Sequence, residues 1–167
     1  AGHGVRSVLD CACGTGRHLL LFHSLGLEVV GSDVSAAMLA QARAKLPQVT
    51  LVQADLRGEW PPPDAASALA GPYDRIVSTY LLHEFSLDHK LALLRGLAER
   101  CLAPGGRIVI GDIAFESVQA RTDAGADRWD EEEHYWAADE TQAACAAAGL
   151  WFTYTQVSHC GGVYVFT

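Results

Sequence analysis

The sequence predicts an α/β protein of the Rossmann-like, doubly wound class, with a mostly parallel seven-stranded sheet that ends in an antiparallel hairpin. Short β-branched runs alternate with longer helical patterns, which is typical of parallel strands joined by crossover helices. The last two strand patterns are separated only by residues 158–161, a link that is too short for a crossover helix and long enough for a hairpin. We expect the strand order 3-2-1-4-5-7-6 along this sheet.

The first part of the chain supplies four strand patterns and three long helical patterns. Each strand pattern is a short β-branched run, each helical pattern is longer, and the helix over 87–102 is amphipathic. Pro47 closes the second helix. A Pro-rich loop over 57–72 is long enough to suggest a functional role. The expected strands cover 5–10, 28–32, 49–53 and 74–79, and the expected helices cover 17–25, 35–45 and 87–102.

The second part completes the sheet. Pro104, Gly105 and Gly106 form a turn into residues 107–113, an almost wholly apolar run expected of a strand that is buried on both faces. From 114 to 138 the pattern breaks down into a charged and aromatic stretch. A last helix over 139–148 ends at Gly149, and the hairpin strands cover 151–157 and 162–166.

Composition limits the function classes. The 167 residues suit one domain, and a net charge of -8 disfavours nucleic acid and anionic membranes as partners. Apolar runs are far shorter than the ~20 residues that cross a bilayer, and no basic-then-apolar signal opens the chain. We therefore expect a soluble, cytoplasmic protein whose five scattered cysteines are reduced and mostly structural.

A glycine loop joins the first strand to the first helix. Gly14 and Gly16 lack a Cβ, so a ligand can approach the main chain next to a helix N-terminus. Glycines also serve tight turns for steric reasons alone, which is the alternative interpretation. A dinucleotide loop would need glycine at Leu19. Asp10, at the end of the first strand, would repel a pyrophosphate but attract an amino group or a sulfonium.

Two further carboxylates follow the next two strands. Asp33 closes the second strand, where a carboxylate can accept hydrogen bonds from ribose hydroxyls. Asp55 closes the third strand and can accept a hydrogen bond from an adenine amino group. Any one of these residues could simply cap a helix or form a turn. Three acids at the ends of successive strands favour a shared ligand.

These motifs resemble the class I S-adenosylmethionine-dependent methyltransferases. Residues 8–16 (VLDCACGTG) are similar to motif I, and residues 31–39 (GSDVSAAML) to the segment that follows it. Residues 53–56 (QADL) are similar to the adenine-contacting acid, and residues 102–107 (LAPGGR) to the turn before the fifth strand. Within the family, residues 76–83 and the closing strands resemble the small bacterial YrrT-like methyltransferases.

The resemblance implies a role for each matched residue. S-adenosylmethionine is the implied cofactor, and its methionine part would be lined by the motif I loop. Asp33 would contact the ribose, Val34 and Met38 the adenine face, and Asp55 the adenine amino group. Thr79 and Tyr80 would lie near the sulfonium and its methyl group. The implied loop and strand-end residues also include Asp10, Ala12, Cys13, Gly14, Gly16 and Leu56.

Two departures from the family pattern stand out. The usual first glycine of motif I is Ala12, which adds a methyl group where the backbone approaches the cofactor closely. Family members carry one or two helices before the first strand, whereas residues 1–167 are expected to form a single methyltransferase core domain that lacks these upstream lid helices.

Methyl transfer from a sulfonium mainly requires alignment of the acceptor with the methyl group and exclusion of water. If the acceptor loses a proton, His83 is the expected base, because it follows the fourth strand and titrates near neutrality; Tyr80 is the second expected catalytic residue. The alternative is a histidine that packs at a helix start. Glu84 could orient His83 or favour the helix N-terminus.

The charged, aromatic segment 128–136 lies where this fold commonly builds an acceptor lid. The alternative is a surface excursion that Trp129 and Trp136 anchor in the core. No metal is expected, since Cys11 and Cys13 lie in the loop, and His18 and His23 are not spaced as a zinc pair.

The predicted function is methyl transfer from S-adenosylmethionine to a small-molecule acceptor. The alternative is a non-catalytic module that binds S-adenosylmethionine or S-adenosylhomocysteine as a sensor or partner subunit. A nicotinamide-dependent oxidoreductase is disfavoured by Asp10, by Leu19 and by the terminal hairpin. Neither the acceptor nor the oligomeric state follows from the residues.

Overall fold

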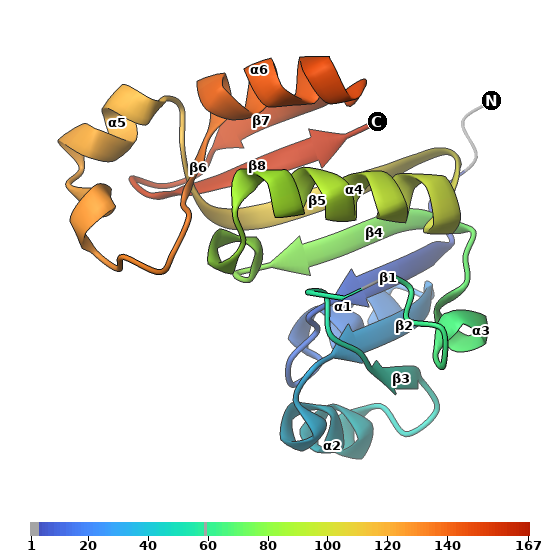
Figure 1. The fold of residues 1–167 in the computed structure, drawn as a ribbon. Helices are drawn as coiled ribbons and strands as arrows, with labels where there is room; N and C mark the ends of the chain where they lie inside the picture. Colours follow the sequence, from blue (N-terminus) through green and yellow to red (C-terminus); the bar gives the residue numbers. More distant parts are fainter. Residues whose placement is uncertain (1–3, 59) are drawn as a thin grey trace.

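The computed structural model describes residues 4–58 and 60–167. Its centre is an eight-stranded sheet with the order β3-β2-β1-β4-β5-β8-β7, in which the short strand β6 pairs with β5 outside this path. Strands β3, β2, β1, β4 and β5 are parallel to one another, and β8 pairs antiparallel with both β5 and β7. The predicted fold class, hairpin and strand order are confirmed, because β7 and β8 are the sixth and seventh strands of the prediction (Figure 1). The predicted number of seven strands is wrong, because the short strand β6 adds an eighth.

Most element boundaries lie within two residues of the predicted ones. The strands are β1 Ser7–Cys11, β2 Glu28–Asp33, β3 Thr50–Gln53, β4 Tyr73–Thr79, β5 Leu102–Phe115, β6 Trp136–Ala137, β7 Phe152–Gln156 and β8 Gly161–Phe166. The helices are α1 Arg17–Ser24, α2 Ala36–Lys45, α3 Ala66–Leu69, α4 Leu87–Cys101, α5 Val118–Asp123 and α6 Ala138–Ala148, with short 3-10 turns η1 Leu82–Glu84 and η2 Ala126–Arg128.

Side chains of neighbouring residues on β1 enter cores on opposite faces of the sheet. Val8 packs with Leu19 of α1 and with Leu39 of α2. Leu9 packs in the larger core, which includes Leu94 of α4 and residues of α6. A strand that is buried on both faces has an almost continuously apolar sequence for this reason. Figure 1 shows α4 and α6 in front of the sheet.

Apart from the short elements α3 and η1, which lie where no element is predicted, the structure differs from the expected elements in two segments. The predicted turn at residues 104–106 belongs to β5, which pairs with β4 through a register shift between Tyr73 and Arg75; Gly105 has a φ of 75° there. The stretch 114–138, for which no element is predicted, contains α5, η2 and β6. None of these is longer than six residues, so each is too short to leave a clear periodic pattern.

Two features concern the whole described chain. All five cysteines are free, and four of them are buried. Among the described residues, no helix combines the length and the apolar character that crossing a membrane requires.

Candidate functional site

The glycine loop joins the end of β1 to the start of α1. Gly14 and Gly16 both have left-handed backbones, with φ of 54° and 78°. A Cβ built on Gly16 would lie 3.1 Å from the Cβ of Ala42, whereas one on Gly14 would meet no described atom within 4 Å. Steric packing therefore explains Gly16, while Gly14 leaves open space beside its main chain.

Ala12 also has a left-handed backbone, with a φ of 63°. This conformation is strained for a residue with a Cβ, which explains why the resembled motif has glycine at this position. The neighbouring Cys13 is buried, and its N–H donates to the carbonyl oxygen of Ser32 at 2.8 Å. The loop is thus held in this conformation by its connection to β2.

Replacing Ala12 with glycine should stabilise the fold by about 1 kcal/mol, because relief of the left-handed strain exceeds the added freedom of the unfolded chain. For a domain of this size, thermal denaturation should show a rise in Tm of about 2–4 °C. The control is Ala124→Gly, at an exposed residue with an ordinary φ of -72°. That variant should lose about 0.5–1 kcal/mol, and equal losses in both variants would contradict the strain at Ala12.

Asp10 lies in β1 beside the loop, with only 1% of the residue exposed. Neither carboxylate oxygen has a hydrogen-bond partner in the described part of the chain. Burial, followed by the negative charge of Asp33, raises the pKa of Asp10 from 3.8 to about 7. Because a buried ionised carboxylate is costly without a partner, Asp10 favours either a bound proton or a nearby cation.

Asp33, the last residue of β2, connects two loops. One carboxylate oxygen accepts the N–H of Gly14 at 2.8 Å, and the other accepts the N–H of Ser35 at 2.8 Å. Each oxygen retains a further lone pair, and the residue is only half-buried. Asp33 can therefore accept hydrogen bonds from a ligand while it holds the glycine loop.

Asp55 follows β3 at the same edge of the sheet. It accepts the N–H of Arg57 at 2.9 Å and lies 3.7 Å from the Arg57 guanidinium. A pocket between the strand ends, here called the strand-end pocket, brings together residues that the sequence analysis assigned to the cofactor. These are Ala12, Asp33, Val34, Asp55 and Leu56, with Leu81 and Phe85 as apolar walls.

Eight predicted residues lie outside the lining of that pocket: Asp10, Cys13, Gly14 and Gly16 of the glycine loop and the end of β1, and four residues from other segments. Met38 is on α2 and is 43% exposed. The hydroxyl of Thr79, at the end of β4, lies 3.4 Å from Nδ1 of His18. Tyr80 is 72% exposed and adopts a φ of 54°. His83 lies in η1 with 9% of the residue exposed.

His83 is held by a buried carboxylate that the sequence analysis did not single out. Its Nδ1 lies 2.6 Å from Oδ1 of Asp112, and its main-chain N–H donates to Oδ2 of the same residue at 2.9 Å. Its Nε2 lies 3.5 Å from Oε1 of Glu133. The hydrogen bond with Asp112 raises the pKa of His83 above its ordinary value, with burial opposing and the charges of Asp112 and Glu133 adding to the rise. Asp112, and not Glu84, orients the ring.

A second pocket lies next to the strand-end pocket and shares Arg57 and Phe85 with it. Its volume is about 420 Å³, and it is called the acidic pocket here. Arg57 lies 3.9 Å from the Glu84 carboxylate. The complete lining is Arg57, Glu84, Phe85, Asp130, Glu132 and Glu133.

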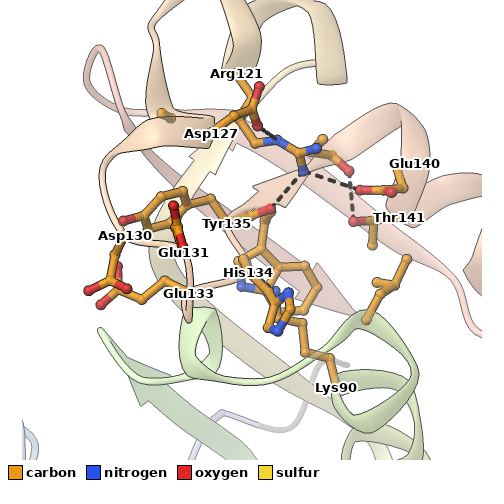
Figure 2. A pocket seen from close by; sticks show the side chains of 14 residues that line it. Lys90, Arg121, Asp127, Asp130, Glu131, Glu133, His134, Tyr135, Glu140 and Thr141 are labelled. Carbon is orange, nitrogen blue, oxygen red and sulfur yellow. Dashed lines mark hydrogen bonds and ion pairs between the residues drawn. The ribbon is translucent and has the colours of Figure 1, made fainter.

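The 129–135 segment lines the acidic pocket and also a further pocket of about 260 Å³. Figure 2 shows this further pocket. Its main chain is anchored at several points. The N–H of His134 donates to the carbonyl oxygen of His83 at 2.5 Å, Lys90 Nζ donates to the carbonyl oxygen of His134, and Arg121 donates to that of Tyr135 at 3.0 Å. Trp136 is buried, whereas Trp129 is 47% exposed.

Sequence reasoning missed Asp112 and Lys90. Asp112 stands in an apolar strand pattern, and Lys90 in the amphipathic helix α4, where it is 2% exposed and lies 4.3 Å from the Trp136 ring centroid. Burial lowers the pKa of Lys90 to about 8. A lone carboxylate in a buried strand requires a partner, and that signal could have drawn attention to Asp112.

A doubly wound sheet with acids at the ends of three neighbouring parallel strands, beside a glycine loop, defines a protein that binds a nucleotide-like ligand in the strand-end crevice. The comparison with known families makes this class specific. The chain belongs to the family described as methyltransferase domain, which it matches over residues 8–106. The resemblance to a methyltransferase is thereby confirmed, and the YrrT-like subgroup stays a prediction.

Individual relatives agree with this family. The chain is 33% identical over 114 residues to an uncharacterized methyltransferase of Oceanobacillus iheyensis, covering 68% of this chain and 50% of the relative. It is 40% identical over 106 residues to a trans-aconitate 2-methyltransferase of Azoarcus sp., covering 62% and 38%. The chain thus spans half or less of the length of these relatives.

Solved structures share the fold at low identity. DesVI of Streptomyces venezuelae has a TM-score of 0.72 at 23% identity, covering 97% of this chain and 83% of that one. The complex of DhpI with SAM and HEP has a TM-score of 0.74 at 22% identity, covering 96% and 78%.

Proposed function

We propose that this chain binds S-adenosylmethionine at the strand-end pocket and supports methyl transfer to a small-molecule acceptor. The family match and the methyltransferases among its relatives support this proposal. The observation that carries it is the half-buried Asp33 carboxylate, which holds Gly14 and Ser35 at the pocket edge and keeps lone pairs for a ribose. No feature of the site favours the non-catalytic alternative.

The residues present suit this cofactor. Val34, Leu56 and Phe85 give the pocket apolar walls for an adenine, and Asp55 supplies an acceptor for its amino group. Asp10 is a buried carboxylate whose oxygens have no partner among the described residues, which matches the positive charge of a sulfonium compound. Bound there, the cofactor would supply an activated methyl group.

The chain's own contribution is to position the partners and exclude water. Asp33 couples the glycine loop to the β2 end, so that the loop and the ribose-binding carboxylate form one unit. The 129–135 segment, anchored through its main chain, forms a wall of the neighbouring acidic pocket. The acceptor therefore enters beside the cofactor, where Arg57 and Phe85 belong to both pockets.

Calorimetric titration with S-adenosylmethionine and S-adenosylhomocysteine tests the cofactor site. Loss of a charged hydrogen-bond acceptor should weaken binding of both compounds by roughly 1.5–3 kcal/mol in Asp33→Asn, which corresponds to about 10–150-fold in Kd. Asp55→Asn should weaken binding by a smaller factor, because its half-exposed carboxylate is already paired with Arg57.

The matched control is Glu99→Gln, which removes one charge from an exposed position near the end of α4. It should bind both compounds like the parent. Parent-like affinity in Asp33→Asn, with the fold intact by circular dichroism, would contradict the ribose contact.

A small acceptor fits the charge of the chain. A net charge of -8 and the carboxylates of the acidic pocket oppose phosphate-rich partners.

Five free cysteines support a reducing, cytoplasmic environment.

A further inference from the structure

Asp112 is the fixed end of a chain of polar groups that starts in β5. Its side chain is fully buried, and each oxygen accepts two hydrogen bonds. Oδ1 accepts the N–H of Ile113 at 2.9 Å and faces Nδ1 of His83, and Oδ2 accepts the N–H of His83 and, at 3.1 Å, Nε1 of Trp136. A carboxylate with this many partners has no freedom to turn.

Because Asp112 is fixed, the His83 ring that it contacts is held in one orientation. Its side chain is 11% exposed, its Nδ1 is bound to Asp112, and its main chain is tied to both Asp112 and His134. Only Nε2 remains, and it faces Glu133 at 3.5 Å. The residue does not contribute to the lining of the acidic pocket, so the ring lies behind the pocket wall.

Glu133 is the outer end of the same chain. Its side chain is 28% exposed, and it lines the acidic pocket next to the strand-end pocket. Glu133 also contributes to the lining of the 260 Å³ pocket shown in Figure 2, together with Lys90. Of these three side chains, the one that can reach the acceptor is therefore the Glu133 carboxylate and not the His83 imidazole.

We propose that Glu133 is the residue that takes the proton of the methyl acceptor, and that His83 and Asp112 are positioning residues that hold its carboxylate. The acceptor class is an amine or another group that gives up an N–H or O–H proton. This inference rests on the proposed methyl transfer, and it assigns the base role to Glu133 in place of His83.

The proton balance defines the acceptor. The cofactor would supply a methyl group and keep the electron pair of its carbon–sulfur bond on sulfur. The acceptor nitrogen forms the new bond to carbon and releases one proton, which an oxygen of Glu133 receives and passes to solvent at the pocket mouth. A carboxylate acceptor has no proton to release, and the acidic pocket would repel it.

The first test is the titration of His83 by NMR in the parent, in Glu133→Gln and in Glu131→Gln. The pKa of His83 should fall in Glu133→Gln, since a facing negative charge is lost, and should stay at the parent value in Glu131→Gln. The groups around His83 are Asp112 from β5, Glu133 and the Tyr135 ring from the 129–135 segment, and the adjacent Glu84. Glu133 shares the acidic pocket with the charged groups of Arg57, Glu84, Asp130 and Glu132, and it shares the 260 Å³ pocket with those of Lys90, Arg121, Asp127, Glu131 and Glu140. This measurement needs neither cofactor nor acceptor.

The second test is methyl transfer from S-adenosylmethionine to a panel of primary amines, secondary amines, alcohols and carboxylic acids that includes trans-aconitate. With the amine that reacts fastest, Glu133→Gln should lower kcat by about 10²–10⁴-fold, whereas Glu131→Gln should stay within about threefold. Glu131 is the matched control because it is an exposed glutamate of the same segment outside the acidic pocket.

The positioning role has its own readout. His83→Gln keeps a hydrogen-bond donor but removes the cationic partner of Glu133, so the acid limb of the kcat/KM profile should move to higher pH. A purely structural role of His83 would lower the rate without moving that limb.

Three results would overturn the proposal: an unchanged His83 titration in Glu133→Gln, equal rates in Glu133→Gln and Glu131→Gln, or a carboxylic acid as the best acceptor. Calorimetry separates this from failure of the proposed function, because Glu133→Gln should bind S-adenosylmethionine like the parent. A parent protein that does not bind the cofactor would count against the proposed function, and the His83 titration would then still show whether the Glu133 carboxylate faces His83.

Discussion

Replacing Asp10 with asparagine should make the folded protein more stable than the parent at pH 8, by on the order of 4 kcal/mol. The pKa of Asp10 rises from 3.8 when it is solvated to about 7 in the fold, and each pKa unit corresponds to about 1.4 kcal/mol. A raised folded-state pKa means that the fold is favoured below the unfolded pKa and loses that stability as the pH rises to about 7. Asparagine cannot ionise, so it removes this loss.

Urea denaturation from pH 4 to pH 8 measures the effect. The two proteins should have similar stability near pH 4 and diverge as the pH rises. Asp74→Asn is the control with the opposite sign, because hydrogen bonds from the main chain of Arg6 and Ser7 lower the pKa of Asp74. A parallel course for the parent and Asp10→Asn across this range would show that Asp10 is ionised in the fold without cost.

Asp112→Asn should destabilise the fold by about 3–5 kcal/mol, the usual result of breaking a buried charged pair. The new amide group would present hydrogens to donors that now face a carboxylate oxygen. The pKa of His83 lies above its ordinary value in the parent, so the pair contributes fully below about pH 6.5 and its contribution is lost as the pH rises through the folded-state pKa. The destabilisation should accordingly be larger at pH 5.5 than at alkaline pH.

Denaturation at both pH values, with Asp130→Asn as the control, measures this effect. Asp130 is exposed and accepts one main-chain N–H, from Glu132 at 2.9 Å, so its loss should cost less than about 1 kcal/mol. A similar small loss for Asp112→Asn would mean that its four hydrogen bonds contribute little.

The order of the sheet was predictable because short β-branched runs alternate with longer helical patterns, and because central strands such as β1 are buried along almost their whole length. The antiparallel pair was predictable because residues 158–161 are too few to cross the sheet. The strand β6 was not predictable, because a strand of two residues shows no periodic pattern. Its position also depends on the hydrogen bond from the Trp136 indole to Asp112, which lies 24 residues earlier in the sequence.

The cofactor side of the candidate site followed from the sequence because its carboxylates stand at strand ends, and parallel strands bring their ends to one edge. The acceptor side did not. Asp112, His83 and Glu133 come from three separate segments, and nothing in the local pattern of residues 128–136 distinguishes Glu133 from its acidic neighbours. Glu133 is distinguished from its acidic neighbours by a tertiary contact, the one between its carboxylate and Nε2 of His83.

The 129–135 segment is fastened to the domain through its peptide groups: His134 by both its N–H and its carbonyl, and Tyr135 by its carbonyl. Such attachments do not depend on which side chain a position carries. Substitutions at Asp130 or Glu132 can therefore change what the acidic pocket accepts while the peptide path stays in place, so new acceptor preferences can evolve here at little cost to folding.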